Sequence, residues 1–172
     1  ELHAVVRNRR LVAAALGYES VKQFREIGET LAFLREPHWP DRPTEALGRL
    51  PAFLPLLKAS PRSVPRPLDY DTVQTGAEVD LTRLPVWTCW PEDAGPLITW
   101  GLVVTRGTRK PRQNIAPYRQ QVIGRNRVIM RWLSHRGGAL DFRDWQRDHP
   151  GKPFPVVVMI GADPALLVAA AT

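Results

Sequence analysis

The sequence predicts an α+β fold, in which a helical segment precedes a small, largely antiparallel β-barrel or sheet with attached helices. Three observations support this prediction. Residues 20–37 have the spacing and capping of an amphipathic helix. Residues 118–133 form two strand-like runs around a glycine-containing turn. The proline-rich segment SPRSVPRP at residues 60–67 separates the two patterns.

The first helix is the most clearly marked element. Ser20 and Gln23 have the spacing of a capping box, and Pro37 ends the run. Five apolar residues recur between them at helical spacing: Val21, Phe24, Ile27, Leu31 and Leu34. We therefore predict a helix over residues 21–36.

The next segment predicts a change of domain. A second, shorter helix is expected over residues 44–58, interrupted at Pro51, and the proline-rich segment follows as an extended linker. Placing the boundary there assigns residues 1–66 to one domain and residues 67–172 to another.

The second domain is predicted to be rich in strands. Residues 72–76 resemble a short strand, and ITWGLVVT at residues 98–105 is β-branched and aromatic. The runs YRQQVI and RVIMRWL flank Gly124-Arg125-Asn126, which is the pattern of a β-hairpin.

The last elements follow the hairpin. Residues 140–149 predict a helix and residues 155–160 a buried strand. Asp163 as N-cap and Pro164 at the first helical position predict a final helix, which runs for about two turns before the sequence stops. Because the sequence also starts with Glu, we expect a fragment or an ordered part of something longer.

Composition narrows the function classes. The apolar fraction of 44% is enough for a packed core, and the net charge of +7 favours an anionic partner. A single cysteine, Cys89, excludes an intrachain disulfide and favours a reducing, cytoplasmic setting; we expect it to be a small buried hydrophobic residue. Apolar runs are too short to span a bilayer. No H-E-x-x-H, G-x-S-x-G, P-loop or G-x-G-x-x-G motif is present, so hydrolase and Rossmann interpretations have no support.

Positive charge is concentrated in one stretch, because residues 94–140 contain nine Lys or Arg and no acid. Arg119 is expected on the first strand of the hairpin, while Arg127 and Arg131 would share a face of the second strand. Together with Arg136 and Gly137, Arg131 could form a phosphate cradle. A solvated basic face paired with acids elsewhere in a longer chain explains the pattern equally well.

Three further residues could take part in chemistry. Asn114, expected in a loop, offers an amide oxygen that suits a hard cation, although most loop asparagines cap turns. Tyr118 and Trp132 could stack on a flat ring, but filling the core is the commoner use of strand aromatics.

Two long stretches, TCWPEDAGPLITWGLVVTRG at residues 88–107 and RQNIAPYRQQVIGRNRVIMRWLSHRGGALDF at residues 112–142, resemble the UbiD-type decarboxylases. These are the 4-hydroxy-3-polyprenylbenzoate decarboxylases of ubiquinone biosynthesis and their relatives. The helix ESVKQFREIGETLAFLREP is similar to the N-terminal domain of the same family, so the resemblance extends from about residue 17 onward.

The resemblance implies a fold and a cofactor. The fold would be the end of an N-terminal α/β domain followed by part of a split β-barrel that binds flavin, with a C-terminal domain for homo-oligomerisation beyond residue 172. The cofactor would be prenylated FMN, supplied by a partner flavin prenyltransferase. Its phosphate would be tied to the protein by Mn²⁺, with a monovalent cation such as K⁺ nearby.

The resemblance also implies roles for individual residues. Asn114 would be a metal ligand, and Arg119 would be the catalytic arginine that holds the substrate carboxylate. The residues in contact with the cofactor would be Pro117, Tyr118, Arg119, Arg131, Trp132, Leu133, Arg136 and Gly137.

The sequence differs from the family pattern in three respects, two of which we expect to matter. Ala116-Pro117 replaces the usual Gly-Ile, so a backbone N–H is lost at Pro117. Thr108 replaces a common proline, which we expect to be inconsequential. The family's second metal ligand, a glutamate, and its acid/base carboxylates would lie beyond Thr172, so these 172 residues alone should not decarboxylate anything.

The expected function is therefore part of a non-oxidative carboxy-lyase acting on an aromatic or unsaturated carboxylic acid. The favoured substrate is 4-hydroxy-3-polyprenylbenzoate, in a cytoplasmic protein that could attach peripherally to the inner membrane. One alternative is a metal-independent split-barrel flavin-binding protein. Another is a basic nucleic-acid-binding module, which Glu92-Asp93 and the acidic helix at residues 25–36 disfavour; we expect no nucleic acid as partner.

Overall fold

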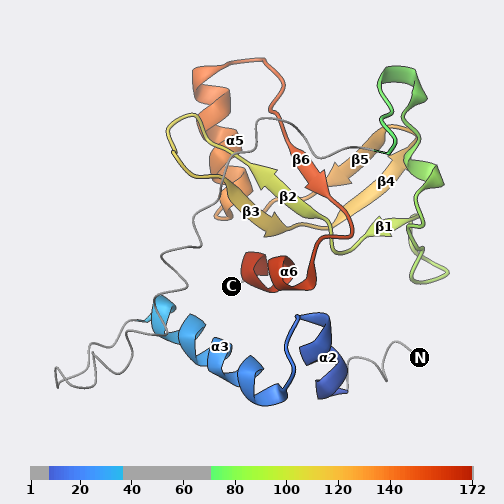
Figure 1. Ribbon diagram of the computed structural model, residues 1–172. Helices are drawn as coiled ribbons and strands as arrows, with labels where there is room; N and C mark the ends of the chain where they lie inside the picture. Colours follow the sequence, from blue (N-terminus) through green and yellow to red (C-terminus); the bar gives the residue numbers. More distant parts are fainter. Residues whose placement is uncertain (1–7, 37–70, 172) are drawn as a thin grey trace. The chain divides into compact units, whose positions relative to one another are not determined.

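The computed structural model of the protein describes residues 8–36 and 71–171 (Figure 1). The chain divides into two compact units, Glu1–Thr72 and Val73–Thr172. The helix predicted over residues 44–58 and the linker at residues 60–67 lie outside the described residues, so the domain boundary placed there stays a prediction.

The first unit contains two described helices, α2 (Arg9–Ala15) and α3 (Val21–Arg35). The predicted capping box of α3 is confirmed: Ser20 Oγ accepts a hydrogen bond from the Gln23 backbone N–H at 3.4 Å, and Gln23 Oε1 accepts one from the Ser20 N–H at 3.2 Å. Helix α2 was not predicted, although Asn8 caps it by accepting from the backbone N–H of Arg10 at 3.1 Å.

The second unit begins with two short 3₁₀ helices, η1 (Gly76–Glu78) and η2 (Leu81–Arg83). The strand predicted over residues 72–76 is wrong, because no strand is assigned there and the chain turns into η1. Gly76, the first residue of η1, has a φ of 53°. This left-handed conformation interrupts an extended strand and is favourable for glycine.

Two three-stranded antiparallel sheets form the centre of the second unit (Figure 1). One has the order β1-β4-β5, with β1 (Leu97–Ile98), β4 (Gln120–Gly124) and β5 (Arg127–Met130). The other has the order β3-β2-β6, with β3 (Asn114–Pro117), β2 (Leu102–Thr105) and β6 (Val157–Met159). The predicted α+β class with antiparallel sheets is confirmed, whereas closure into a split barrel stays a prediction.

The single strand predicted over residues 98–105 is instead two strands in different sheets. The chain leaves β1 and crosses to β2 through residues 99–101. A Cβ atom at Gly101 would lie 3.0 Å from both Ile98 Cγ2 and Gln120 Nε2, so any other residue there would require these side chains to shift. A second crossing, Tyr118-Arg119, joins β3 to β4, and the Tyr118 N–H donates to Gly101 O at 3.3 Å.

The predicted hairpin is confirmed as β4 and β5, which are joined by a two-residue turn, Arg125-Asn126. Its strands are shorter than predicted, and Arg131 follows β5 rather than continuing it. The turn is held from outside the hairpin, because the Leu81 N–H donates to Arg125 O at 2.6 Å.

Two helices pack on the second sheet (Figure 1). Helix α5 (Gly137–Asp148) contacts β2 and β3, and α6 (Pro164–Ala171) contacts β3. The prediction for residues 140–149 is confirmed, with a start three residues earlier. The predicted N-cap of α6 is also confirmed, since Asp163 Oδ1 accepts from the Ala165 N–H at 2.7 Å.

The core of the second unit combines strand residues with an aromatic cluster. Its buried apolar members are Ile98, Leu102, Val103, Tyr118 and Val122. The ring of Trp132 lies 6.1 Å from that of Tyr118 and 6.0 Å from those of Phe142 and Phe154. Tyr118 is buried and Trp132 is half-buried in this cluster, so both contribute to the core, while their predicted contact with a cofactor stays a prediction.

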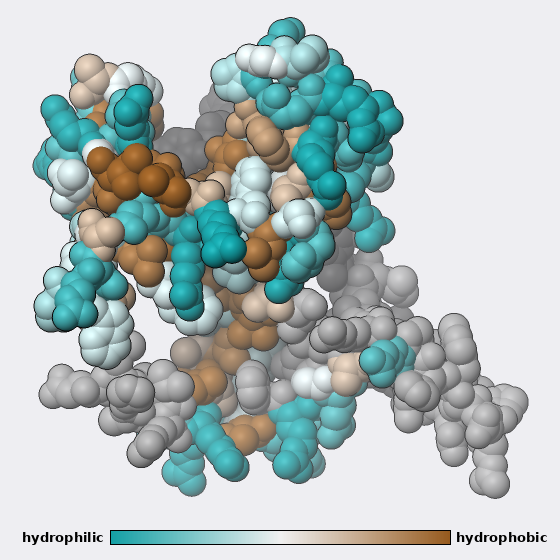
Figure 2. Space-filling view, turned by 180° about the vertical axis from the view of Figure 1, so that it is seen from behind, coloured by the Kyte–Doolittle hydropathy of each residue, from teal (hydrophilic) through white to brown (hydrophobic). Residues whose placement is uncertain are grey.

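Some residues that were expected inside are exposed. Cys89 is exposed, not buried. Strand β6 exists, but Val157 in it is 59% exposed. Among the described strands β6 pairs only with β2, so it is an edge. Figure 2 shows brown hydrophobic residues open to solvent among teal ones on one face. Within residues 8–36 and 71–171, no helix has the length and apolar character needed to cross a membrane.

Candidate cofactor and anion site

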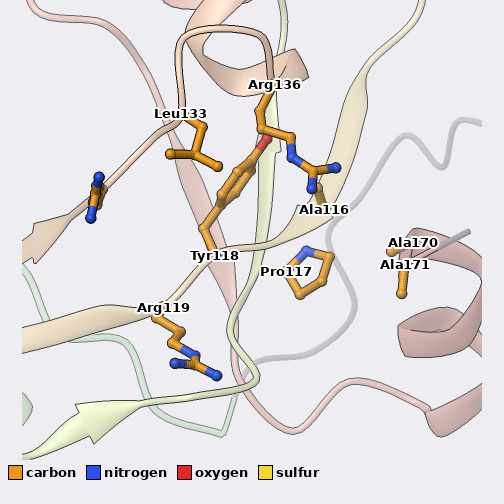
Figure 3. Close-up of a pocket in the computed structure, with 9 residues that line it drawn as sticks. Ala116, Pro117, Tyr118, Arg119, Leu133, Arg136, Ala170 and Ala171 are labelled. Carbon is orange, nitrogen blue, oxygen red and sulfur yellow. The ribbon is translucent and has the colours of Figure 1, made fainter.

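An open cavity of about 580 Å³ lies in the second unit, beside the crossing from β3 to β4 and the start of α5 (Figure 3). Six of its lining residues were predicted to contact a cofactor: Pro117, Tyr118, Arg119, Arg131, Leu133 and Arg136. Arg136 completes its basic wall. Residues that are far apart in the sequence therefore meet around one space.

Three arginines line this cavity, and their charge is not balanced locally. None of Arg119, Arg131 and Arg136 forms a salt bridge with the residues that the structure describes. By contrast, Arg109 and Arg125 each lie within 4 Å of a carboxylate oxygen. The cavity therefore suits an anion, and planar guanidinium groups can bind phosphate or carboxylate through two hydrogen bonds.

The arginines occupy different parts of the cavity. Arg119 lies in the crossing between β3 and β4, not on a strand as predicted, and Arg136 is the N-cap residue of α5. In Figure 3 Arg119 and Arg136 lie on opposite sides of Pro117 and Tyr118. Two separate anionic groups, or the two ends of one ligand, could thus be bound.

The start of α5 offers hydrogen-bond donors to the same region. The Gly138 N–H donates to the Tyr118 hydroxyl at 3.1 Å. Among the described residues, the N–H groups of Gly137 and Ala139 have no hydrogen-bond acceptor, and Arg136 makes no side-chain cap. The N-terminus of a helix with open N–H groups favours an anion.

Asn114 lies directly beside this helix start. It is the first residue of β3, not a loop residue as predicted, and it is paired with Thr105 across the sheet. Its Nδ2 donates to Thr105 Oγ1 at 3.2 Å, while its Oδ1 lies against Gly137. A Cβ atom at Gly137 would lie 2.7 Å from Asn114 Cγ and closer still to Oδ1, so only glycine permits this approach.

The residues present fit one side of a cofactor and metal site. The amide oxygen of Asn114 accepts no hydrogen bond from any described residue and is a suitable ligand for a hard cation. Within residues 8–36 and 71–171, no group of three His, Cys, Asp or Glu side chains could hold a metal alone. Asn114 would therefore be one ligand among several, next to a wall that suits a phosphate.

The structure separates two of the predicted contacts from the cavity. The side chain of Trp132 packs in the aromatic cluster, and Gly137 lies against Asn114; neither lines the cavity. Pro117 departs from the family pattern. It lies on β3, opposite Leu102 of β2. Because β3 is an edge strand among the described ones, the missing N–H of Pro117 interrupts no ladder there.

Sequence reasoning missed three lining residues, Ala116, Ala170 and Ala171. The last two belong to α6, and no sequence signal places that helix beside β3. Thr108 was judged inconsequential, yet its hydroxyl donates to Asp148 on α5. The Arg109 hydrogen bond, followed by that of Thr108, lowers the pKa of Asp148 below its ordinary value.

Comparisons with known proteins agree on one class, the decarboxylases. A family model described as the UbiD 3-octaprenyl-4-hydroxybenzoate carboxy-lyase Rift-related domain matches residues 62–172. The chain belongs to the UbiD family, whose members are carboxy-lyases.

Solved structures extend this result. The UbiD-class enzyme HmfF from Pelotomaculum thermopropionicum, in complex with FMN, is 32% identical over 55% of this chain and 21% of its own, with a TM-score of 0.50. An evolved dimeric form of HmfF in complex with prFMN has the same identity and TM-score over 22% of its length. Vanillic acid decarboxylase from Sedimentibacter hydroxybenzoicus, in closed form, is 28% identical over 56% of this chain and 21% of its own, with a TM-score of 0.51. This chain thus spans about a fifth of the length of these solved relatives.

Proposed function

We propose that this chain is the cofactor-binding part of a prenylated-FMN-dependent decarboxylase. The observation that supports this proposal is the cavity lined by three arginines without salt bridges among the described residues. One of them, Arg136, is the N-cap residue of α5, and the amide oxygen of Asn114 lies beside the first residue of that helix, outside the cavity lining. The two HmfF structures are complexes with FMN and with prFMN, and these cofactors have a phosphate and a flat ring system.

Several groups in and beside the cavity have a proposed role. Arg136 and the N–H groups at the start of α5 bind the cofactor phosphate, and Asn114 contributes one oxygen to a divalent metal such as Mn²⁺ beside it. A monovalent cation such as K⁺ is proposed nearby. Leu133 and Pro117 exclude water from the apolar part of the cofactor.

Arg119 is proposed to be the catalytic residue that holds the substrate carboxylate. In decarboxylation the C–C bond to the carboxylate breaks, CO₂ leaves, and a proton replaces it on the carbon. Bound prenylated FMN supplies the electron sink for the pair left on that carbon. The guanidinium of Arg119 orients the carboxylate before the step. No acid lines the described cavity, so we assign the proton to none of its side chains.

The proposed substrate is an aromatic carboxylic acid, specifically 4-hydroxy-3-polyprenylbenzoate of ubiquinone biosynthesis. The WLSHRGGALDF stretch and the description of the matching family support this choice. We further propose a flavin prenyltransferase as cofactor supplier, homo-oligomerisation through parts outside this chain, and a cytoplasmic location with peripheral attachment to the inner membrane.

A cofactor-release experiment tests the proposal. The full-length decarboxylase that carries this chain would be co-expressed with a flavin prenyltransferase, purified with Mn²⁺ and denatured, and the released small molecule weighed by mass spectrometry. Prenylated FMN is the expected result. Absence of any flavin, with co-purifying nucleic acid instead, would overturn the proposal.

The Asn114→Ala variant separates this proposal from metal-independent flavin binding. If Mn²⁺ links the protein to the cofactor phosphate, the variant should retain much less cofactor than the parent protein. Equal retention with and without Asn114 would support the metal-independent alternative. Substrate choice is then tested by turnover of 4-hydroxy-3-polyprenylbenzoate against vanillate.

A further inference from the structure

A chain of polar side chains leads from Lys110, in the segment after β2, through Asp141 of α5 to Asn114. Lys110 Nζ donates to Asp141 Oδ1 at 2.8 Å, Thr105 Oγ1 donates to Asp141 Oδ2 at 2.7 Å, and Asn114 Nδ2 donates to Thr105 Oγ1 at 3.2 Å. Asp141 is 0% exposed and Thr105 is 2% exposed. A buried carboxylate is costly unless it is fully paired, so this arrangement needs an explanation.

The direction of each hydrogen bond follows from the groups available. An ionised carboxylate can only accept, and the Lys110 ammonium can only donate. The single proton of the Thr105 hydroxyl is therefore committed to Asp141, and the Thr105 oxygen can only accept from its other neighbour. That neighbour is Asn114, which must present its NH₂ group to Thr105.

This hydrogen bond also fixes the direction of the Asn114 amide oxygen. Because Nδ2 is turned toward Thr105, Oδ1 is turned toward the start of α5, where Gly137 leaves room for it. An amide rotated by half a turn would present NH₂ there instead, and NH₂ cannot ligate a cation.

We propose that Asp141 and Thr105 are positioning residues that fix the rotamer of the Asn114 amide so that its oxygen faces the metal. This inference rests on the proposed function, in which Asn114 ligates Mn²⁺. Partners of this kind, one step behind a ligand, typically change metal affinity when they are removed, by roughly 10- to 100-fold.

Mn²⁺ binding to the full-length decarboxylase tests the inference, measured from the electron paramagnetic resonance signal of free Mn²⁺ during titration. The Thr105→Val variant keeps the side-chain shape but removes the hydroxyl, and we expect Mn²⁺ affinity to fall by roughly 10- to 100-fold. The Thr105→Ser variant restores the hydroxyl and should restore affinity.

Asp141→Asn gives a second and more specific test. An amide at position 141 can donate to Thr105, which frees the Thr105 proton to turn toward Asn114 and to reverse its amide. Mn²⁺ affinity should fall as in Thr105→Val. If this buried substitution prevents folding, as a thermal unfolding curve would reveal, the Thr105 pair still decides the question.

A matched control comes from another contact to the same helix. Thr108 also donates a hydroxyl proton to a carboxylate of α5, that of Asp148, but has no bond to Asn114. Thr108→Val should leave Mn²⁺ affinity unchanged.

The Asn114→Ala variant distinguishes failure of the positioning role from failure of the proposed metal site. If Asn114→Ala weakens Mn²⁺ binding while Thr105→Val does not, the positioning role is wrong and the metal site stands. If Asn114→Ala also binds Mn²⁺ like the parent protein, the proposed metal site itself is wrong.

Discussion

At the scale of single residues, the site depends on a contact that only glycine allows. Gly137 occupies the first position of α5, where alanine would ordinarily be a better helix former. Asn114 comes so close that a Cβ atom would overlap its amide. Glycine is therefore needed here for space, since its φ is not in the left-handed region.

Gly137→Ala should accordingly destabilise the second unit despite the gain in helix propensity. The new methyl group must displace the Asn114 amide or the start of α5, and overpacking of this kind costs about 1–3 kcal/mol. Chemical denaturation followed by circular dichroism would measure the change in the free energy of unfolding.

Gly28→Ala provides the matched control, because nothing lies within 4 Å of a Cβ placed at Gly28 in α3. This substitution should stabilise α3 by about 0.5–1 kcal/mol. Equal effects of the two substitutions would contradict the steric argument.

At the scale of elements, two carboxylates of α5 hold the segment that follows β2, and a third lies beside it. Asp141 pairs with Lys110, and Asp148 accepts from Thr108 and Arg109, the latter at 2.9 Å. A Cβ atom at Gly107 would lie 3.1 Å from oxygens of both Asp141 and Asp144. The helix that begins at the proposed phosphate end is thereby fixed to the strand that carries Thr105.

The contact of Asp148 should make stability depend on pH. Hydrogen bonds from Arg109 and then Thr108 lower the pKa of Asp148 below its ordinary 3.8. A carboxyl whose pKa is lower when folded stabilises the fold above its ordinary pKa, and this contribution is lost as pH falls through the folded value. The melting temperature of Asp148→Asn should therefore fall less than that of the parent chain between about pH 5 and about pH 3.

An exposed acid serves as control for that titration. Glu92→Gln removes a carboxylate that has no salt bridge among the described residues, so its melting curve should follow the parent chain. Because Arg109 is 59% exposed, added salt should reduce the difference that Asp148 makes. An unchanged pH profile in Asp148→Asn would contradict the assignment.

The N-cap of α3 gives a prediction for the first unit. Ser20→Ala removes one bond of the capping box and should cost about 1 kcal/mol of local helix stability. Amide hydrogen exchange in the first turn of α3 would report it. Ser20→Asp, which can still accept from the Gln23 N–H, should retain most of the protection.

These elements also explain which sequence predictions were sound. The hairpin and α3 follow from local signals, a turn with Gly124 and a capping box at Ser20, which act within a few residues. The strand over residues 98–105 was misjudged because its break at Gly101 is set by the approach of Gln120, a residue of another strand. The sequence around Gly101 does not predict that approach.

In the candidate site, too, the features set by neighbouring residues could be predicted, and those set by tertiary packing could not. Arg131 and Arg136 follow a hairpin that could be predicted, so their convergence was foreseeable. The placement of Asn114 beside Gly137 depends on the packing of α5 against β3. The placement of Ala170 at the cavity depends on the packing of α6 against β3. Cys89 was misjudged because a small apolar residue is usually buried, whereas here its surroundings are open.

At the scale of the whole molecule, the second unit leaves large apolar side chains uncovered. Trp87, Trp90 and Trp100 are 66%, 72% and 66% exposed. Tryptophan is enriched at protein interfaces relative to the rest of the surface. The chain also spans about a fifth of its solved relatives, which fits a unit that is proposed to pack against further parts of a longer protein.

Tryptophan fluorescence should detect this exposure in the 172-residue chain. Acrylamide should quench most of the emission, and Trp90→Phe should reduce the quenchable part. Trp132→Phe should instead remove a protected part, since Trp132 lies within the aromatic cluster. Protection of Trp90 in the isolated chain would show that this surface is covered by the chain itself.

The two crossings between the sheets have one more consequence. The crossing from β3 to β4 is only two residues long, and hydrogen bonding to Gly101 ties it to the other crossing. Successive side chains of an extended chain point to opposite sides, so one inserted or deleted residue there would turn Arg119 out of the cavity. Homologous proteins that use this arginine should therefore vary in length at the loop between β2 and β3, and keep the spacing from Pro117 to Gln120 constant.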